Sequence, residues 1–322
     1  MRILYIGEKD THDQYLKGNV PSHWLYGAIE MERDGHDVIW TQESKSSWHD
    51  LDIIKRHAHD IVFIPNLNLH SHLLLLLLAA LGIYRKPIYA YLHREPAGTT
   101  GLKGCVYKVL LRSVKHLFFL SPLSMKQVLD NGMSKPERCS LPGWGADMDF
   151  FSDVPVSDNG CFVSTGKENR DFDILIEAFR IAGAPLHIFT SASHNGADYT
   201  DLTDKCRDIP NIKITLVDNS PANYTAMLAE MASARALVCP LRQDRLKYCV
   251  GLSTIADAEG LGKRLIITDN PYHMPRNEAF MRVNSVDDWV KAINAISADY
   301  GERKSDFSMS KAYNNMKIIM NL

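Results

Sequence analysis

Short apolar runs alternate with longer amphipathic stretches along the first half of the chain. Residues 3–6 and 61–65 are runs of mostly apolar side chains, as expected for strands buried on both faces. Stretches such as the leucine-rich residues 71–82 have the length and composition of helices. The pattern predicts strands at 3–6, 37–40, 61–65, 87–92, 117–121 and 139–142, and helices at 23–34, 71–82, 101–115 and 124–131. Strands alternating with helices indicate a parallel sheet with helical crossovers.

Residues 150–160 interrupt this alternation. They carry Asp, Ser, Pro, Asn and Gly without clear periodicity, which is typical of a linker. The alternation then restarts, with strands expected at 161–165, 186–191, 212–216, 236–240 and 264–268, and helices at 171–182, 224–233, 252–261 and 287–299. We therefore predict two Rossmann-like, doubly wound α/β domains, residues 1–152 and 153–305, facing each other across a ligand-binding cleft. The last segment, 306–322, is expected to be a helix. It either packs back on the first domain or ends the second one.

Composition narrows the function classes. The 322 residues suit two domains, and the formal net charge of −2 gives no general attraction to nucleic acid. Six cysteines without a CxxC pair suggest reduced, buried thiols and a cytoplasmic protein. The chain starts on a strand rather than a signal peptide, and its longest apolar run, 73–83, is about half of the ~20 residues that a spanning helix needs.

The segment around residue 250 carries the most specific chemistry. A strand, a polar loop at 242–249, a glycine-opened helix and a second strand follow one another. The free amides of a helix N-terminus bind phosphate, and Gly251 would let a phosphate approach closely, with hydroxyl donors on Ser253 and Thr254. Asp257 can accept hydrogen bonds from ribose hydroxyls. The alternative is a capped helix with a solvated carboxylate.

The order of these residues resembles the donor-site signature of GT-B glycosyltransferases, especially family 4. The matching residues are Gly251-Leu252-Ser253-Thr254, Asp257-Ala258, Gly262-Lys263 and Ile267-Thr268-Asp269. The resemblance implies the GT-B fold and places Leu252 in the donor site with its neighbours. The family usually has Glu at the position of Asp257, and another Glu near the transferred sugar, where this chain has Cys249.

Two further segments carry the same resemblance. By this likeness, Lys167 and Arg170 would meet the donor pyrophosphate, which suits a point charge and a fork of donors. The alternative is that Arg170 pairs with Asp171 or Asp173. The segment from Leu141 through Asp147 resembles the Pro–Gly–Asp–Phe turn that closes the first domain, with a structural role.

On the acceptor side, three residues are candidates. Gly18 lies in a loop after the first strand, where this family has a glycine-bearing loop near phosphate or acceptor; a surface turn is the alternative. His93 and Glu95 follow the strand at 87–92, at the carboxyl end where ligands gather. His93 would bond the sugar and Glu95 would act as general base, unless backbone groups simply satisfy both.

These observations favour a hexosyltransferase-like enzyme that moves a sugar from a nucleotide-diphosphate sugar to a glycan or lipid-linked acceptor. No Asp-x-Asp stands near a predicted nucleotide-binding strand, and no histidine–carboxylate pattern indicates a metal, so neither a metal nor a cofactor is expected. The resemblance suggests surface polysaccharide or glycolipid assembly. The basic helix 101–115 could bind the inner face of a membrane, or be a solvated face over a core stripe. A non-catalytic nucleotide-sugar-binding protein and a sugar-nucleotide epimerase stay open as alternatives.

Overall fold

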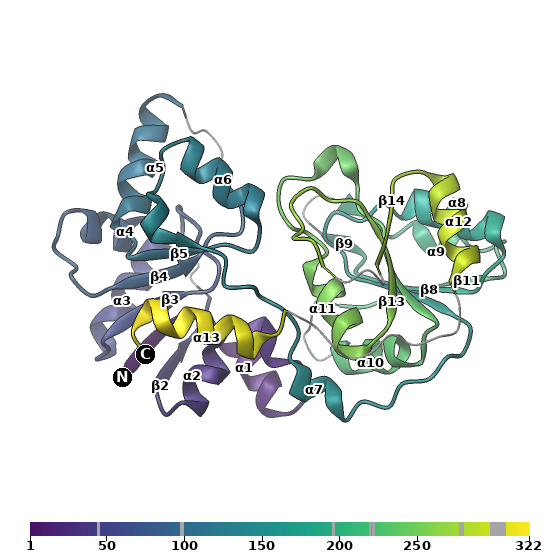
Figure 1. Cartoon of the computed structure of the whole chain (residues 1–322), viewed down its shortest axis with the longest axis horizontal. Coiled ribbons are helices and arrows are strands. Elements are labelled where there is room, and N and C mark those ends of the chain that lie inside the picture. Colours follow the sequence, from purple (N-terminus) through teal and green to yellow (C-terminus); the bar gives the residue numbers. More distant parts are fainter. Residues whose placement is uncertain are drawn as a thin grey trace.

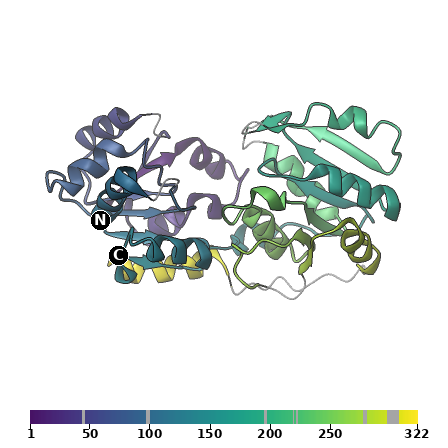
Figure 2. The ribbon, with the colours of Figure 1, turned by 90° about the horizontal axis from the view of Figure 1, so that it is seen from above.

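Two α/β domains lie side by side, each built on a six-stranded parallel sheet (Figures 1 and 2). The computed structural model describes residues 1–43, 46–96, 100–194, 197–218, 220, 223–276, 280–296 and 307–322. The central strands of both sheets are mostly apolar and buried, as parallel strands covered by helices on both faces must be, whereas the edge strands are partly exposed. The prediction of two doubly wound domains is confirmed.

The first sheet has the strand order β2-β1-β3-β4-β5-β6. Its strands are β1 (Arg2–Glu8), β2 (Asp37–Thr41), β3 (Ile61–Ile64), β4 (Ile88–Tyr91), β5 (His116–Phe118) and β6 (Cys139–Ser140). Its helices are α1 (Lys9–Leu16), α2 (Ala28–Arg33), α3 (Ser47–Arg56), α4 (Leu73–Ala80), α5 (Gly101–Ser113) and α6 (Pro122–Asp130), with short 3₁₀ turns η1 (Ser22–Leu25) and η2 (Pro136–Arg138). The chain leaves β1 towards one edge and β3 towards the other, so the topological switch point lies between these two strands.

The second sheet has the order β11-β8-β7-β12-β13-β14. Its strands are β7 (Phe162–Thr165), β8 (Leu186–Thr190), β11 (Ile212–Leu216), β12 (Ala236–Cys239), β13 (Arg264–Thr268) and β14 (Phe280–Val283), and β9 (Ser193–His194) and β10 (Ala197–Asp198) form a small hairpin. The helices are α8 (Phe172–Ala182), α9 (Leu202–Lys205), α10 (Tyr224–Ser233), α11 (Leu252–Leu261) and α12 (Val286–Ala295), with the turn η4 (Gln243–Arg245). The switch point lies between β7 and β12.

One expected helix is broken. Residues 23–34 form η1 and then α2, because Tyr26 (φ 50°) and Gly27 (φ 91°) adopt left-handed conformations between them. The pattern missed α1 and α3, whose buried residues are only Thr11 in α1 and Asp50 and Ile53 in α3. The expected helix 287–299 is α12, and residues 297–299 lie outside the described part of the chain.

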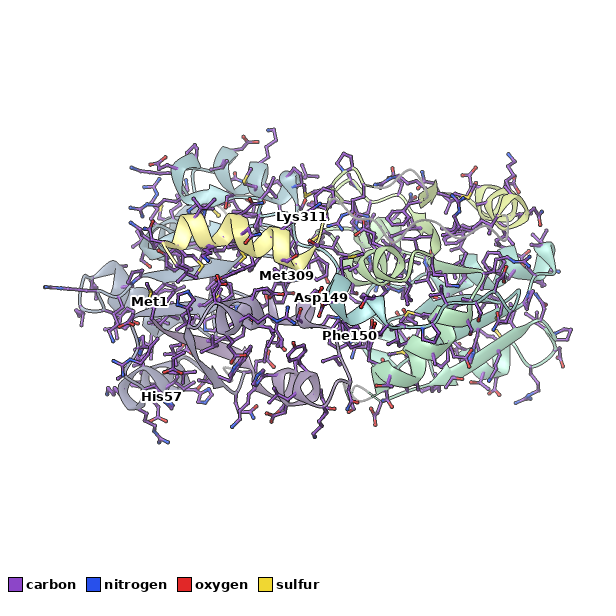
Figure 3. All side chains as sticks on the ribbon, turned by 60° about the horizontal axis from the view of Figure 1, so that its bottom comes forward. Met1, His57, Asp149, Phe150, Met309 and Lys311 are labelled. Atoms are coloured by element: carbon purple, nitrogen blue, oxygen red, sulfur yellow. The ribbon has the colours of Figure 1, made fainter. Side chains whose placement is uncertain are left out.

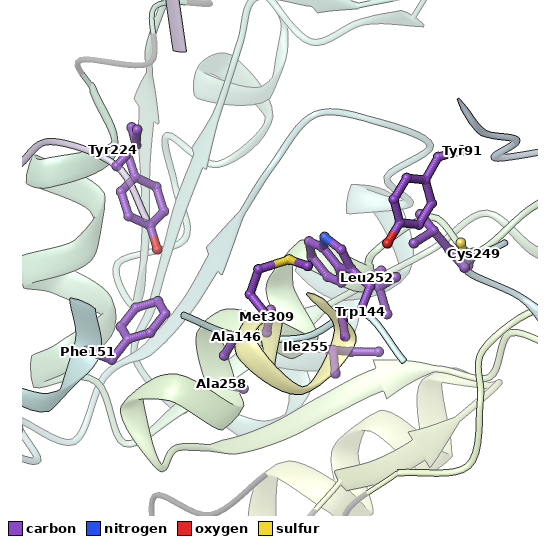
Figure 4. Packing of buried hydrophobic residues seen from close by; sticks show 14 of the residues in the cluster. Tyr91, Trp144, Ala146, Phe151, Tyr224, Cys249, Leu252, Ile255, Ala258 and Met309 are labelled. Atoms are coloured by element: carbon purple, nitrogen blue, oxygen red, sulfur yellow. The ribbon is translucent and has the colours of Figure 1, made fainter. Parts of the chain in front are cut away.

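Helix α7 (Met148–Ser152) joins the domains and packs against α11. A Cβ on Gly260 would stand 2.1 Å from a ring carbon of Phe151, so only glycine permits this approach. Asp149 and Phe150 lie between the two domains (Figure 3). Figure 4 shows Ile255 and Ala258 of α11 in the same apolar cluster as Tyr91 and Trp144 of the first domain. The hydrophobic core is therefore continuous across the domain junction.

A buried ion pair of the second domain lies at the same junction. Arg276 Nη1 donates to Glu259 Oε2 at 2.9 Å, and both side chains are 2% exposed. The guanidinium also donates to the carbonyl of Trp144 and stacks on the ring of Phe307, 4.3 Å away. One arginine thus ties together both domains and the start of the C-terminal segment.

The last helix, α13 (Met309–Met320), lies along the first domain (Figures 1 and 2). Tyr313 donates its hydroxyl proton to Asp34 at 2.8 Å, and Asn315 donates to the carbonyl of Pro142 at 2.9 Å. The Met309 amide donates to the carbonyl of Ala146. The chain therefore crosses back to the first domain at its end. The boundary expected at 305/306 falls outside the described residues.

Candidate functional site

A cavity of about 320 Å³ opens at the carboxyl ends of β7, β8, β11 and β12. This is the switch point of the second sheet, where ligands of doubly wound folds bind. The first domain contributes Trp24, whose ring packs edge-on against Tyr224 with centroids 4.9 Å apart. The cavity is in the range of about 300–1,000 Å³ that small-molecule sites occupy. All other lining residues belong to the second domain, so the cavity lies in that domain and is bordered by the first domain at Trp24.

The N-terminus of α11 forms one wall of this cavity. Gly251 precedes the helix with φ 90°, and a Cβ there would lie 3.1 Å from Cys239 Sγ. The glycine is therefore required by the backbone and by packing on β12. It offers no side chain to cap the first amides of α11, which are free to bind an anion. Ser253 is exposed and lines the cavity, whereas the Leu252 side chain is buried in the core.

Arg170 lines the cavity, but other parts of the protein take most of its donors. Its Nε and Nη2 donate to the Thr165 carbonyl, Nη1 to the Glu168 carbonyl, and Nη2 also to Thr254 Oγ1 at 3.3 Å. No ion pair joins it to Asp171 or Asp173, the aspartates considered as alternatives. A Cβ on Gly166 would stand 2.4 Å from Nη2. Arg170 thus fixes the loop 165–170 against α11, which makes it a positioning residue first.

That loop carries Lys167 into the cavity lining. Burial lowers the pKa of the Lys167 ammonium, and the nearby Glu168 carboxylate opposes this shift. A partly buried ammonium group has lost favourable contacts with water. The negative charge of an anionic ligand would compensate for this loss, so the position suits an anion.

Asp257 lies in the second turn of α11 and also lines the cavity. Its Oδ1 accepts a hydrogen bond of 2.6 Å from the hydroxyl of Tyr224. Burial raises the pKa of Asp257 to about 7, and the Tyr224 hydrogen bond opposes this rise. A buried carboxyl group with one protein partner is placed to accept a further bond from a ligand hydroxyl.

The opposite wall is apolar and was not anticipated from the sequence. Phe189 is the second-last residue of β8, Val217 follows β11, and Met227 and Met231 belong to α10. Asp218 lies next to Val217 at the same strand end. The signal was available, because residues that follow parallel strands at a switch point gather at one site. These side chains suit a flat ring beside a few polar groups.

A second unanticipated feature borders the cavity. Glu168 accepts a hydrogen bond of 2.7 Å from the Tyr248 hydroxyl and also contacts His194 of the β9–β10 hairpin. Arg94 of the first domain lies over the Tyr248 ring, 5.9 Å from its centroid. These contacts connect four segments, one of them from the first domain, next to the cavity-lining residue Glu168.

The structure places His93 and Glu95 outside the cavity lining. His93 Nε2 lies 3.0 Å from the carbonyl of Pro65, which can only accept, so this nitrogen carries the proton. Burial lowers the His93 pKa to about 4. Glu95 accepts a hydrogen bond from Asn131 at the end of α6. Both side chains therefore have partners within the first domain.

Gly18 occupies a left-handed turn (φ 73°) after α1, with open space around it. The next residue, Asn19, accepts a hydrogen bond from Thr225 of α10 through its carbonyl. The loop therefore touches the second domain beside the cavity, although Gly18 is not among the cavity-lining residues.

The Cys249 side chain is buried at the position where family 4 glycosyltransferases, which this segment resembles, have a glutamate. Burial raises its pKa to about 12, so the thiol is neutral. Tyr26 and Glu8 of the first domain both adopt left-handed backbone conformations. Burial raises the pKa of the Tyr26 phenol, and a negative charge on Glu8 or Cys249 would raise it further, so Tyr26 lies near both residues. Non-glycine residues in this conformation gather at functional sites, which marks Glu8 and Tyr26 as candidates that the sequence did not reveal.

Other chemistry is limited in the part of the chain that the structure describes. No group of three or more histidine, cysteine or carboxylate side chains is arranged to hold a metal ion there. All six cysteines are free, and Cys105 is exposed rather than buried as expected. Among the described helices, none combines the length and the apolar character needed to cross a bilayer.

Comparison with known proteins supports the architecture. No family model and no curated protein matches the sequence. A protein of Listeria monocytogenes assigned as a UDP-N-acetylglucosamine 2-epimerase is similar over 99% of this chain and 95% of its own, with TM-score 0.63 and 11% identity. The UDP-GlcNAc 2-epimerase of Neisseria meningitidis, solved with UDP-GlcNAc, covers 100% and 99%, with TM-score 0.56 and 10% identity. AviGT4, a glycosyltransferase involved in avilamycin A biosynthesis, covers 99% and 92%, with TM-score 0.53 and 9% identity. At such low identity the likeness concerns the fold, and it shows that this chain has the GT-B fold.

Proposed function

We propose that the protein is a glycosyltransferase that binds a nucleotide-diphosphate sugar in the cavity of the second domain. One observation carries this proposal. The start of α11, Lys167 and the Asp257 carboxyl line a single cavity at the switch point of the second sheet, and Trp24 of the first domain borders it. These groups match the parts of a nucleotide diphosphate: anionic oxygens, ribose hydroxyls and a flat base.

In this proposal the diphosphate meets the first amides of α11, the Ser253 hydroxyl and the Lys167 ammonium. Negative charge grows on the leaving diphosphate as the glycosidic bond breaks, and fixed donors stabilise that charge. No metal ion is needed, since the helix end and the ammonium supply the positive potential. Asp257 accepts a hydrogen bond from the ribose, and the base lies against Phe189 and Val217.

The acceptor approaches from the first domain. His93 keeps Nδ1 free of a proton, because Nε2 donates to the Pro65 carbonyl. We propose that His93 orients the sugar and that Glu95 or Glu8 accepts the proton of the acceptor hydroxyl. A glycan or lipid-linked acceptor, and a place in surface polysaccharide or glycolipid assembly at the cytoplasmic side, complete the proposal.

A specific observation favours a second candidate, a protein that binds a nucleotide sugar without transferring it. Cys249 presents a neutral, buried thiol where the family has a carboxylate near the transferred sugar, and Arg170 has most of its donors engaged by backbone carbonyls. Such a site would hold the nucleotide and lack part of the catalytic machinery.

One experiment separates these candidates. The protein is incubated with UDP-, GDP- and ADP-sugars, with and without glycan and lipid-linked acceptors, and nucleotide release is followed alongside calorimetric binding of UDP, GDP and ADP. Acceptor-dependent release supports the transferase, binding without release supports the non-catalytic protein, and an epimerised sugar without acceptor would overturn both in favour of an epimerase.

Matched variants locate the site. Lys167→Met and Ser253→Ala are each expected to weaken diphosphate binding roughly tenfold, the effect of losing one charge-assisted hydrogen bond. Lys291→Met, on the exposed face of α12, is the control and should bind normally. Unchanged binding in both site variants would remove the diphosphate from the start of α11.

A further inference from the structure

Positive charge is concentrated in one part of the chain. Residues 61–129 contain a single acidic residue, Glu95, against eight basic ones. The basic residues are Arg85, Lys86, Arg94, Lys103, Lys108, Arg112, Lys115 and Lys126. This segment thus has a formal net charge of +7, while the whole chain has −2. The small net charge of the whole chain therefore conceals a strongly positive segment.

The same segment exposes large apolar side chains on two adjacent helices. Helices α4 and α5 pack against each other in the first domain (Figure 1). The exposed apolar residues are Leu73, Leu77, Leu81 and Ile83 in and just after α4, and Leu102, Val106 and Val109 in α5. Leu102 is 83% exposed and Ile83 67%. Leu73, Leu77 and Leu81 are spaced four residues apart, so they lie along one side of α4. The same holds on α5 for Leu102, Val106 and Val109, which are three or four residues apart. These two rows, together with Ile83, are here called the α4–α5 face.

This arrangement differs from the alternative prediction for helix 101–115, in which a solvated basic face covers a stripe of apolar core residues. Leu110 and Val114 are buried as that view requires, but Leu102, Val106 and Val109 face solvent. The core contact of α5 is made by another set, including Tyr107 and Leu111. Leu102, Val106 and Val109 are therefore available for contact with a partner.

The basic residues around this face keep their charge available. Arg85, Lys86, Lys103, Arg112 and Lys115 are exposed. Among the described residues, none of the five forms an ion pair with a carboxylate. Their contacts that the structure does give are to carbonyls or rings, such as Arg112 Nη2 to the Gly132 carbonyl at 2.9 Å. A partner that supplies negative charge would complete them.

We propose that the α4–α5 face docks on an anionic lipid bilayer. The leucines and valines enter the boundary between headgroups and acyl chains, and the basic side chains contact lipid phosphates. A bilayer offers both an apolar layer and a dense negative surface at once, which is the combination this face presents. No described helix can span the bilayer, so the contact is peripheral. The proposal does not depend on what the cavity binds.

Vesicle flotation tests it. The full chain is mixed with vesicles of phosphatidylcholine alone or of phosphatidylcholine with phosphatidylglycerol, at low and high salt. Binding is expected only with phosphatidylglycerol, and weaker at high salt because the charges are screened. Failure to bind the anionic vesicles at low salt would overturn the proposal.

Two matched pairs of variants locate the contact. Leu102→Ser should lower partitioning roughly tenfold, whereas Ile318→Ser on α13, 76% exposed in the native protein, should leave it unchanged. Lys103→Glu should lower it roughly fivefold or more, whereas Lys291→Glu on α12 should have little effect. Equal losses from site and control variants would mean general charge attraction and would overturn the α4–α5 assignment. Nucleotide binding in solution should be normal in all four, which separates this test from that of the cavity.

Cys105 provides a direct probe, because it is the exposed cysteine on α5. An environment-sensitive dye on Cys105 should shift to the blue with anionic vesicles and be quenched by lipids with brominated acyl chains. A dye that stays in water while the protein floats would overturn the proposal. So would self-association in solution that Leu102→Ser abolishes, since it would identify the face as a contact between two copies of the chain.

Discussion

Replacing Asp257 by Asn tests two effects of this carboxyl group separately: the loss of folding stability caused by its burial and its contribution to ligand binding. Burial raises its pKa from 3.8 to about 7. The folded state therefore holds the proton more tightly than the unfolded chain does. Ionising Asp257 destabilises the fold as the pH rises through the window from about 4 to 7, and the whole penalty is present above it.

The size of the penalty follows from the shift. At 1.36 kcal/mol per pKa unit, the rise to about 7 corresponds to roughly 4 kcal/mol. Asn has nearly the same shape, carries no charge, and its amide oxygen can still accept from the Tyr224 hydroxyl. Asp257→Asn is thus expected to raise the free energy of unfolding by up to about 4 kcal/mol near pH 8, and to change it little near pH 4.

Binding should move in the opposite direction. A carboxylate can accept two ribose hydroxyl hydrogen bonds, whereas Asn offers one acceptor oxygen, so Asp257→Asn should weaken diphosphonucleotide binding roughly tenfold. In the native protein, binding should strengthen as the pH rises through about 7, because ionisation of Asp257 improves the acceptor. Stabilisation together with loss of binding is the signature of a carboxyl kept for its ligand.

Urea unfolding followed by tryptophan fluorescence, at several pH values from about 4 to 8, measures the first effect, and calorimetry with UDP or GDP the second. Tyr224→Phe is the companion variant. It removes the hydrogen bond that lowers the Asp257 pKa, so it should destabilise the protein more at high pH than at low pH. A pH-independent difference between Asp257→Asn and the native chain would refute the reasoning. A lower free energy of unfolding for Asp257→Asn than for the native chain near pH 8 would refute it too.

Three further predictions concern the surrounding structure. Gly166→Ala places a Cβ against the Arg170 guanidinium at a left-handed backbone position. It should lower the free energy of unfolding by about 1–3 kcal/mol in a urea titration and abolish nucleotide binding. A variant that is fully stable and still binds nucleotide would contradict the role given to Arg170. Glu259→Gln leaves the Arg276 guanidinium buried without its carboxylate and should lower the free energy of unfolding by about 3–5 kcal/mol. In a double-mutant cycle, adding Arg276→Met should recover much of this stability. Additive losses from the two substitutions would argue against the ion pair. Cys249→Glu buries an unpaired carboxylate and should lower the melting temperature without creating sugar transfer, so a stable variant with new turnover would show that our placement of Cys249 is wrong.

Much of the architecture could be read from local pattern. The helices at 224–233 and 252–261 have the expected bounds, because both their apolar spacing and their end signals lie within the segment itself. Parallel strands joined by helices in turn require that loops at the carboxyl ends gather at one edge. That rule brings Lys167, Ser253 and Asp257 to one cavity although about ninety residues separate the first from the last.

Other features depended on which distant segments meet. Trp24 borders the cavity because the first domain packs against the second there, and the buried Cys249 lies near enough to Tyr26 of the first domain for a charge on it to raise the pKa of Tyr26. Most donors of Arg170 are engaged because the turn at Gly166 brings backbone carbonyls within reach. Helix periodicity alone could not tell which side of α5 faces the core, since Leu102 and Leu110 are equally apolar. Local pattern thus predicted the order and kind of most elements, though not α1 and α3, because backbone hydrogen bonding and apolar spacing act over a few residues. Whether a given side chain is buried, paired or exposed depends on neighbours far away along the chain, so it became visible only in the folded protein.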